Sequence, residues 1–288
     1  MRVLVVANPV AGRGLGERVG RAVAEGLRRR GVAAELHLTG TRADRRTRLA
    51  AECAGADVVV AVGGDGTLRE VLEGLPDPDV PVGVVPAGTA NVLARDLALP
   101  RGVDRAVDTI LRGKCIRLDV ARVGGRLCFL AASVGFDAMA VRELERRRRG
   151  PVSWWTWAGA LARTFARYRP PRLTVEIDGT ALPGQWGLVI VSNCVRYAGL
   201  LRLAADRRLD DGLFEAHLLR DASRFGLAAA VACGVVAGLP DGVCELRRAR
   251  RVRITSEEPV PYQVDGDRGG ETPMELEVLG RQHRLLVP

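Results

Sequence analysis

The chain has 288 residues, 47% hydrophobic and 27% charged, an ordinary globular composition that suits one large domain or two modest ones. The formal net charge of +9 and the pI of about 10.0 favour anionic partners such as nucleic acid, nucleotides or acidic membrane surfaces. The six cysteines are scattered without a CxxC pair, which argues against a disulfide framework or a zinc site.

Basic residues are almost all arginine, since Lys114 is the only lysine among 43 lysines and arginines. Any cation that holds a phosphate here is therefore an arginine or a metal. The amino terminus lacks the pattern of a signal peptide. The longest apolar run, 15 residues from Phe225, is short for a bilayer span, and we expect it to form a buried helix.

Three similar units make up the first hundred residues. Each is a strand, a glycine-containing turn and a helix, over residues 2–27, 57–75 and 80–99, and residues 32–40 add a strand between the first two. Strands that alternate with helices indicate a parallel sheet covered on both faces. Ligands bind such sheets at the carboxyl ends of the strands, where the three turns lie.

The pattern changes after about Leu118, and we expect this half to be mainly antiparallel β structure. An Asp178-Gly179 pair predicts a hairpin turn. Helical patterns interrupt the strands at 154–168 and 223–239. The strand patterns themselves cover 118–136, 172–194, 211–219, 250–267 and 273–288.

The first turn, Asn8-Pro9-Val10-Ala11-Gly12-Arg13-Gly14, follows a strand and opens a helix. Backbone N–H groups at such a position attract phosphate, and Asn8 and Arg13 are its candidate nucleotide contacts. No Gly-Lys-Ser/Thr follows, so this is not a Walker A loop, and the glycine spacing is not that of GxGxxG. A purely structural turn explains the stretch about as well.

The second turn, Gly63-Gly64-Asp65-Gly66-Thr67, is the most specific signal in the chain. Three glycines in four positions suit a backbone that closely approaches a pyrophosphate, because a Cβ atom would block that approach. Asp65 would then hold Mg²⁺ through water or take a proton from an attacking hydroxyl. The alternative is that Asp65 caps the helix that follows it.

The third turn, Pro86-Ala87-Gly88-Thr89-Ala90-Asn91, again ends a strand. Thr89 and Asn91 are candidate contacts to phosphate or ribose, or else they cap the helix that follows. Three glycine turns at one edge of one sheet indicate a ligand site more strongly than any one of them.

These stretches resemble the diacylglycerol kinase catalytic domain family, which includes bacterial lipid kinases and sphingosine kinases. The resemblance spans nearly the whole chain in the motifs "NPVAGRG", "GGDGT", "PAGTANVLARDL", "AASVGFDA", "VSNCVRYAGLLRLAADRRLDDGLFE" and "YQVDGD". It implies an α/β plus β fold, with a Rossmann-like N-terminal domain at 1–118 and a β-sandwich C-terminal domain at 119–280. The strand at 281–288 would return to the first domain.

The resemblance also implies ATP-dependent phosphorylation of a lipid hydroxyl, with ATP bound between the two domains. It places the nucleotide contacts on Thr39, on the Gly63–Arg69 loop and on Thr89. Together with the turn residues above, the candidate nucleotide-binding set is Asn8, Arg13, Thr39, Gly63, Gly64, Asp65, Gly66, Thr67, Thr89 and Asn91.

The resemblance places a structural Mg²⁺ on the Asp211 carboxylate and on the carbonyl groups of Arg208 and Leu213. It offers Asp267, in the Asp265-Gly266-Asp267 stretch, or Asp65 as the general base, and the choice stays open. Three departures from the family pattern are Arg69 in place of asparagine, Ala205 in place of proline and Asp267 in place of glutamate.

A stretch rich in tryptophan and arginine covers residues 143–172. Its aromatic and apolar residues fall at helical spacing with arginines among them, which suits either a membrane interface or a helix packed on the β-sandwich. The stripe consists of Trp154, Trp157, Leu161, Phe165 and Tyr168.

The sequence thus predicts a cytoplasmic lipid kinase that acts on a lipid substrate at an anionic membrane surface through peripheral contact, with ATP and Mg²⁺ and without nucleic acid. The alternatives are an NAD kinase, whose family also carries GGDG, and a nucleotide-binding regulatory protein that has lost catalysis. The identity of the lipid stays open, and so does the choice between a monomer and a homodimer.

Overall fold

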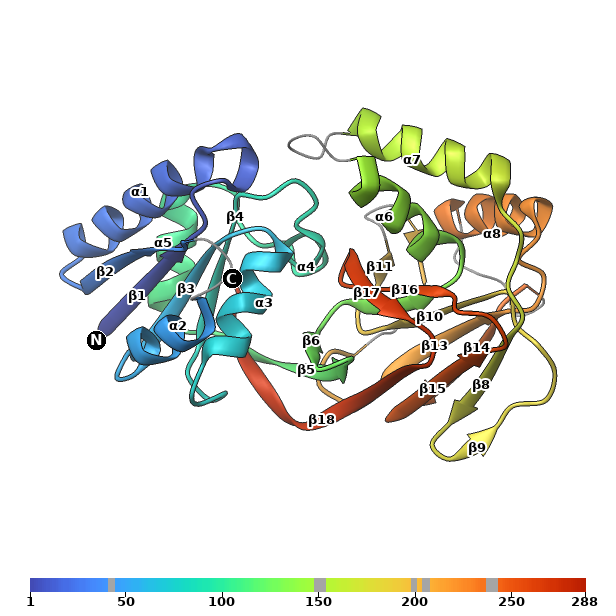
Figure 1. Cartoon of the computed structure of the whole chain (residues 1–288). Coiled ribbons are helices and arrows are strands. Elements are labelled where there is room, and N and C mark those ends of the chain that lie inside the picture. The colour runs from blue at the N-terminus through green and yellow to red at the C-terminus, as the bar shows by residue number, and fades with distance from the viewer. Residues whose placement is uncertain (41–44, 148–153, 198–200, 204–207, 237–242) are drawn as a thin grey trace. The chain divides into compact units, whose positions relative to one another are not determined.

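The structure is a computed structural model that describes residues 1–40, 45–147, 154–197, 201–203, 208–236 and 243–288. The chain forms two compact units (Figure 1). Unit 1 comprises Met1–Leu118 and Arg281–Pro288, so it holds both termini, and unit 2 comprises Asp119–Gly280.

Unit 1 is built on a parallel sheet in the order β2-β1-β3-β4-β18. Strands β1, β3 and β4 are short runs rich in valine, and β1 and β3 are almost fully buried, as expected for a sheet covered on both faces. The predicted Rossmann-like arrangement is therefore confirmed. The strands are β1 (Arg2–Ala7), β2 (Ala33–Leu38), β3 (Val58–Gly63), β4 (Val82–Pro86) and the end of β18 (Met274–Leu286).

Helices cover both faces of this sheet (Figure 1). On one face, α1 (Leu15–Arg29) and α5 (Val103–Arg112) bury Val23, Leu27 and Ile110 against the alternate strand residues. On the other lie α2 (Arg45–Cys53) and α3 (Asp65–Gly74). Two short elements, the 3-10 helix η1 (Ala11–Arg13) and α4 (Val92–Asp96), follow the first and third turns.

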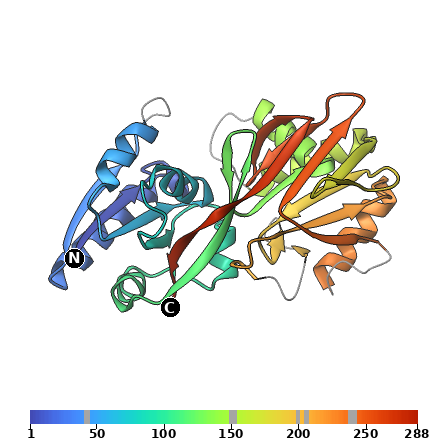
Figure 2. The same ribbon diagram turned by 90° about the horizontal axis from the view of Figure 1, so that it is seen from below.

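Unit 2 contains an antiparallel sheet in the order β14-β13-β10-β7-β16-β17 and a second group of strands in the order β18-β15-β8-β9. Strand β5 pairs with β18, beside which it lies in Figure 2, and with β6. The bounds are β5 (Cys115–Val123), β6 (Arg126–Cys128), β7 (Ala131–Val134), β8 (Leu173–Ile177), β9 (Thr180–Ala181), β10 (Leu188–Ser192), β13 (Phe214–Leu219), β14 (Glu245–Ala249), β15 (Arg251–Ser256), β16 (Pro261–Val264) and β17 (Asp267–Glu271), with a separate hairpin of β11 (Arg196–Tyr197) and β12 (Leu201–Arg202).

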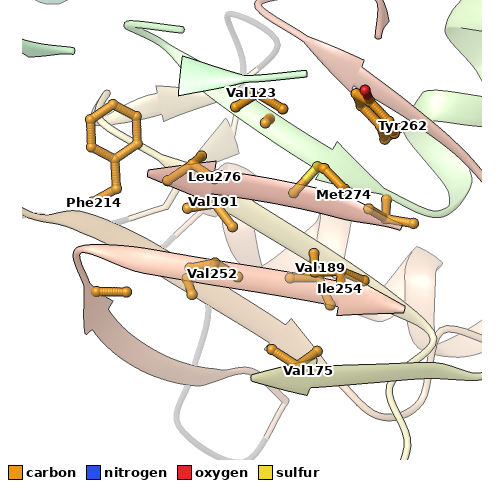
Figure 3. Packing of buried hydrophobic residues seen from close by; sticks show 14 of the residues in the cluster. Val123, Val175, Val189, Val191, Phe214, Val252, Ile254, Tyr262, Met274 and Leu276 are labelled. Atoms are coloured by element: carbon orange, nitrogen blue, oxygen red, sulfur yellow. The ribbon is translucent and has the colours of Figure 1, made fainter. Parts of the chain in front are cut away.

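The core of unit 2 lies between its two sheets (Figure 3). Val189 and Phe214 from the antiparallel sheet face Val252 and Leu276 from the other group of strands, and all four are almost fully buried. Side chains from two inner faces that interdigitate in this way define a β-sandwich. The predicted C-terminal fold class is confirmed.

Three helices cover the outer face of the antiparallel sheet, α6 (Phe136–Arg147), α7 (Trp154–Arg167) and α8 (Arg224–Val236). The sequence pattern predicted the last two and missed α6. The expectation that α8 is buried is wrong: Leu227 and Ala230 face the sheet, whereas Phe225 is 88% exposed and Val231 49%. A helix on the outside of a two-sheet core has one face to bury, whatever its composition.

The residues of the predicted aromatic stripe on and after helix α7 differ in how far they are buried. Tyr168, just after the helix, is buried, Trp157 is half-buried, and Phe165 is exposed although its ring packs edge-on against Phe136. Trp155, off the predicted stripe, is 78% exposed. The side chain of Trp154 lies outside the described part of the chain.

Candidate active site

The three glycine turns lie at one edge of the unit 1 sheet. Ala7, the last residue of β1, is opposite Val62 in β3, and Gly63 is opposite Pro86 at the end of β4. Because the strands are parallel, the turns that follow them emerge side by side. The predicted convergence of the turns is thus present in the structure.

Close backbone packing between the turns accounts for two of the glycines. A Cβ atom on Gly12, which has a φ of 56°, would lie 2.1 Å from the carbonyl oxygen of Ala87. A Cβ atom on Gly88 would lie 2.5 Å from the Cα of Gly64. These positions require glycine for contact between turns, whether or not a ligand is present.

Polar side chains fasten the turns further. Asn8 Nδ2 donates to Thr67 Oγ1 at 3.4 Å, which links the first turn to the second, and Thr67 is buried. Asn91 closes the third turn on itself, since its Oδ1 accepts the Gly88 N–H at 3.0 Å and its Nδ2 donates to the Gly88 carbonyl at 2.8 Å. Asn8, Thr67 and Asn91 therefore shape the edge of the sheet.

Asp65 connects the second turn to the third. Its carboxylate accepts the backbone N–H groups of Val92 at 3.0 Å and Leu93 at 3.3 Å, the first residues of α4. Asp65 thus caps a helix, but not the helix α3 that it begins. Burial raises the pKa of Asp65, and the two N–H groups oppose that rise.

Two residues at this edge have features that packing does not explain. Gly66 is exposed and has no left-handed backbone conformation, and a Cβ atom there would have no described atom within 4 Å beyond its chain neighbours and its own helix backbone. Thr39, directly after β2, is buried, and its Oγ1 has no hydrogen-bond partner in the described part of the chain. An open glycine at a helix start and an unsatisfied buried hydroxyl are both features of a ligand site.

The other candidates at this edge are less informative. Thr89 is exposed. Arg13 lies in η1, but its side chain is outside the described residues. Arg69, one of the departures from the family pattern, is buried in α3.

The predicted metal loop lies in unit 2, where the fully buried Asp119 holds it. The Asp119 N–H donates to the Leu209 carbonyl at 2.6 Å, and its Oδ2 accepts the Gly212 N–H at 2.7 Å. Asp211 Oδ1 accepts the Leu213 N–H at 3.1 Å. Ala205, a second departure, lies outside the described residues.

The candidate base, Asp267, follows a tight turn between β16 and β17. Asp265 and Gly266 both have positive φ, 50° and 85°, as a two-residue hairpin turn of type I′ requires. The Asp265 carboxylate accepts the N–H groups of Leu130 at 2.9 Å and Ala131 at 3.1 Å. Asp267 is partly exposed, and its Oδ2 lies 3.5 Å from Arg126 Nη2.

A polar cluster in unit 2 was not predicted, although its members lie in three of the motif stretches. Ser133 and Gln263 are buried, and Asp137 and Tyr197 are half-buried. Asp137 Oδ2 accepts hydrogen bonds from the hydroxyl groups of Ser133 and Tyr197, and Gln263 Nε2 lies 2.9 Å from Ser133 Oγ and 3.0 Å from Tyr197 Oη. The available signal was limited to Ser133 and Gln263, polar residues inside strand patterns, since Asp137 lies in α6 and Tyr197 in the short strand β11.

Comparison with known proteins identifies the class defined by this fold. Residues 2–123 match the diacylglycerol kinase catalytic domain, and residues 131–287 match the YegS C-terminal NAD kinase beta sandwich-like domain. A crystal structure of a diacylglycerol kinase from Bacillus anthracis str. Sterne has the same fold, with a TM-score of 0.75, 18% identity and coverage of 100% of this chain and 97% of that chain.

The chain belongs to the diacylglycerol kinase family. It is 30% identical over 302 residues to the diacylglycerol kinase of Bacillus subtilis (strain 168), covering all of this chain and 96% of that protein. It is 28% identical over 296 residues to that of Mycobacterium tuberculosis (strain CDC 1551), covering all of this chain and 95% of that protein. Family membership supports a lipid kinase.

The contacts between turns predict opposite effects for two glycine substitutions. Gly88→Ala forces its Cβ against Gly64 and should destabilise the protein by about 1–3 kcal/mol. Gly66→Ala enters open space near the start of a helix and should be neutral or stabilising by up to about 1 kcal/mol. Urea unfolding measures both, and equal losses would contradict the assignment of Gly88 to packing.

The raised pKa of Asp65 predicts a pH-dependent effect of Asp65→Asn. A carboxyl group whose pKa is higher in the folded state stabilises below its unfolded pKa of about 3.9, and this contribution is lost as the pH rises through the folded value. Asparagine does not titrate and accepts with one oxygen. The unfolding free energy of the variant, relative to wild type, should therefore improve from pH 4 to pH 7. A constant difference would contradict the raised pKa.

Proposed function

We propose that the chain is an ATP-dependent lipid kinase that transfers the γ-phosphate of ATP to the hydroxyl group of a diacylglycerol-like lipid. The observation that carries this proposal is the open Gly66 at the N-terminus of α3, at the edge where the glycine turns converge. Neither packing nor backbone conformation requires glycine there, whereas a phosphate group close to the backbone does.

Unit 1 would hold the nucleotide. The N–H groups at the start of α3 and the partial positive charge of the helix favour the phosphates. The hydroxyl of Thr39, which has no partner among the described residues, and the exposed Thr89 offer neutral hydrogen bonds nearby. Asp65 then has a structural role in nucleotide binding, because it fixes the third turn against the second.

The Asp211 loop of unit 2 fits Mg²⁺ in its chemistry. The Asp211 carboxylate and the carbonyl groups of Arg208 and Leu213 are oxygen ligands, which this ion prefers. Among the described residues, no group of three or more His, Cys, Asp or Glu side chains is arranged to hold a metal ion, so a site here depends on carbonyl groups. When bound, the ion would have a structural role and order the Asp211 loop.

The hydrogen bonds favour Asp267 over Asp65 as the general base. Both carboxylate oxygens of Asp65 accept backbone N–H groups, whereas Asp267 is partly exposed. Asp267 would accept the proton of the lipid hydroxyl. At the same time the hydroxyl oxygen would bond to the γ-phosphorus of ATP, and the bond between the γ-phosphorus and ADP would break. Arg126 lies close enough to orient the Asp267 carboxylate.

Peripheral contact with an anionic membrane is part of this proposal. Trp155 on α7 and Phe225 and Val231 on α8 are exposed apolar side chains on helices that also carry exposed arginines. Aromatic residues with arginines suit the interface between lipid and water. No helix in the described ranges is long and apolar enough to cross a membrane.

A phosphorylation assay tests the function and separates it from the alternatives. The protein is incubated with labelled ATP and Mg²⁺ and either NAD or diacylglycerol in phosphatidylglycerol vesicles. We expect labelled lipid and no labelled NAD. Phosphorylated NAD would establish an NAD kinase, and the absence of any product would favour a regulatory protein without catalysis.

The exposed side chain of Phe225 predicts a defect in vesicle binding. Phe225→Ser removes a large apolar group that burial would favour by about 2 kcal/mol, so binding to phosphatidylglycerol vesicles should weaken at least about 10-fold in sedimentation assays. Binding of the wild type should also weaken as salt screens the +9 charge. Leu15→Ser, an exposed leucine on α1, is the matched control. Equal weakening in both variants would exclude α8 as the docking element.

A further inference from the structure

The turn that carries Asp267 has a second anchor besides Asp265. Gln263 is almost fully buried on β16, and its Oε1 accepts the Gly266 N–H at 2.7 Å. Gly266 directly precedes Asp267, so this hydrogen bond fixes the peptide unit next to the candidate base. Gln263 and Asp265 together therefore fix the position of the turn.

The polar cluster fixes Gln263 in turn. Its Nε2 donates to Ser133 Oγ on β7 and to Tyr197 Oη on β11, at 2.9 Å and 3.0 Å. The two hydroxyl groups donate to Asp137 Oδ2 on α6. Gln263 Nε2 itself lies 3.4 Å from the same oxygen. Asp137 Oδ2 thus lies within hydrogen-bond distance of donors on three other elements of unit 2, β7, β11 and β16.

The hydrogen-bond directions are determined along this route. A carboxylate oxygen only accepts, so both hydroxyl protons point to Asp137, and the hydroxyl lone pairs accept from the Gln263 amide. Nε2 is therefore the donor end of the amide, and Oε1 must face Gly266. Without Asp137 the two hydroxyl protons would have no fixed direction, and the amide would be oriented only by the Gly266 N–H.

We propose that Asp137 is a positioning residue that acts through Ser133, Tyr197 and Gln263 to hold the Asp267 carboxylate in place for proton transfer. This proposal rests on the proposed function. Stability alone does not explain the cluster, because well-packed apolar side chains usually stabilise a buried site as well as a polar network does. What a polar network adds is one fixed arrangement.

Two tyrosines provide a matched test. Tyr197→Phe removes the hydroxyl group between Asp137 and Gln263, whereas Tyr168→Phe removes a buried hydroxyl group that donates to the Gly187 carbonyl at 3.2 Å, outside the cluster. The first measurement is amide hydrogen exchange of the full-length protein over residues 260–271. Exchange in this segment should become faster in Tyr197→Phe and stay unchanged in Tyr168→Phe.

The second measurement is kinetic, with ATP and diacylglycerol in phosphatidylglycerol vesicles. Tyr197→Phe should lower kcat at least about 10-fold, because a small displacement of a catalytic group is costly, and should leave both KM values within about twofold. Gln263→Leu should lower kcat similarly. Since both variants interrupt one route, the double variant should lose no more than the Gln263→Leu variant alone.

The outcomes separate the two proposals. Faster exchange with lower kcat and unchanged KM supports the positioning role. Unchanged exchange, unchanged kcat, fold-losses that multiply in the double variant, or an equal loss in Tyr168→Phe would overturn it. A wild-type protein that phosphorylates no lipid would overturn the proposed function and with it the role of Asp267, while the exchange data would still decide whether Tyr197 and Gln263 hold the turn.

Discussion

The close approach of the second and third glycine turns is the constraint on which the candidate site of unit 1 depends. The Cα of Gly64 and the position of Gly88 leave no room for a side chain, and only at that distance does the Asp65 carboxylate reach the N–H groups that begin α4. The contact packs the second and third turns together, but Gly66 at the start of α3 stays exposed. Gly64 and Gly88 are thus required by packing, whereas Gly66 lies at the proposed ligand site.

In unit 2, as at Asp65 in unit 1, acidic side chains accept backbone N–H groups and so hold loops in place. Asp119 accepts the N–H of Gly212 in the candidate metal loop, and Asp265 accepts N–H groups that include those of Leu130 and Ala131. Hydrogen bonds from backbone N–H groups to a carboxylate are charge-assisted and stronger than neutral ones. Asp119 and Asp265 therefore order loops by binding backbone N–H groups. The acids proposed to bind metal and to accept a proton are two others, Asp211 and Asp267.

The local pattern of the sequence was enough to predict most of the strands, though not β11, β12 or β14, together with the glycine turns and the Asp178-Gly179 hairpin, because these depend on neighbouring residues. Both turn residues of that hairpin have positive φ, 49° and 84°. The side-chain roles depended on distant partners: the residues capped by Asp65 lie 27 and 28 positions away. Helix α6 was missed because it starts two residues after β7, within an apolar run, and α8 was misjudged because composition does not show which face packs.

An acid in the glycine loop therefore has a physical reason that is separate from catalysis. A loop able to wrap phosphate must expose N–H groups, and a short helix such as α4 must satisfy its own first N–H groups. Asp65 supplies an acceptor to α4 from the neighbouring turn, so the start of α3, the proposed phosphate site, is not capped by this side chain. The same charge would repel phosphate if it pointed outward, and its capture by Val92 and Leu93 explains how it is tolerated beside a proposed nucleotide site.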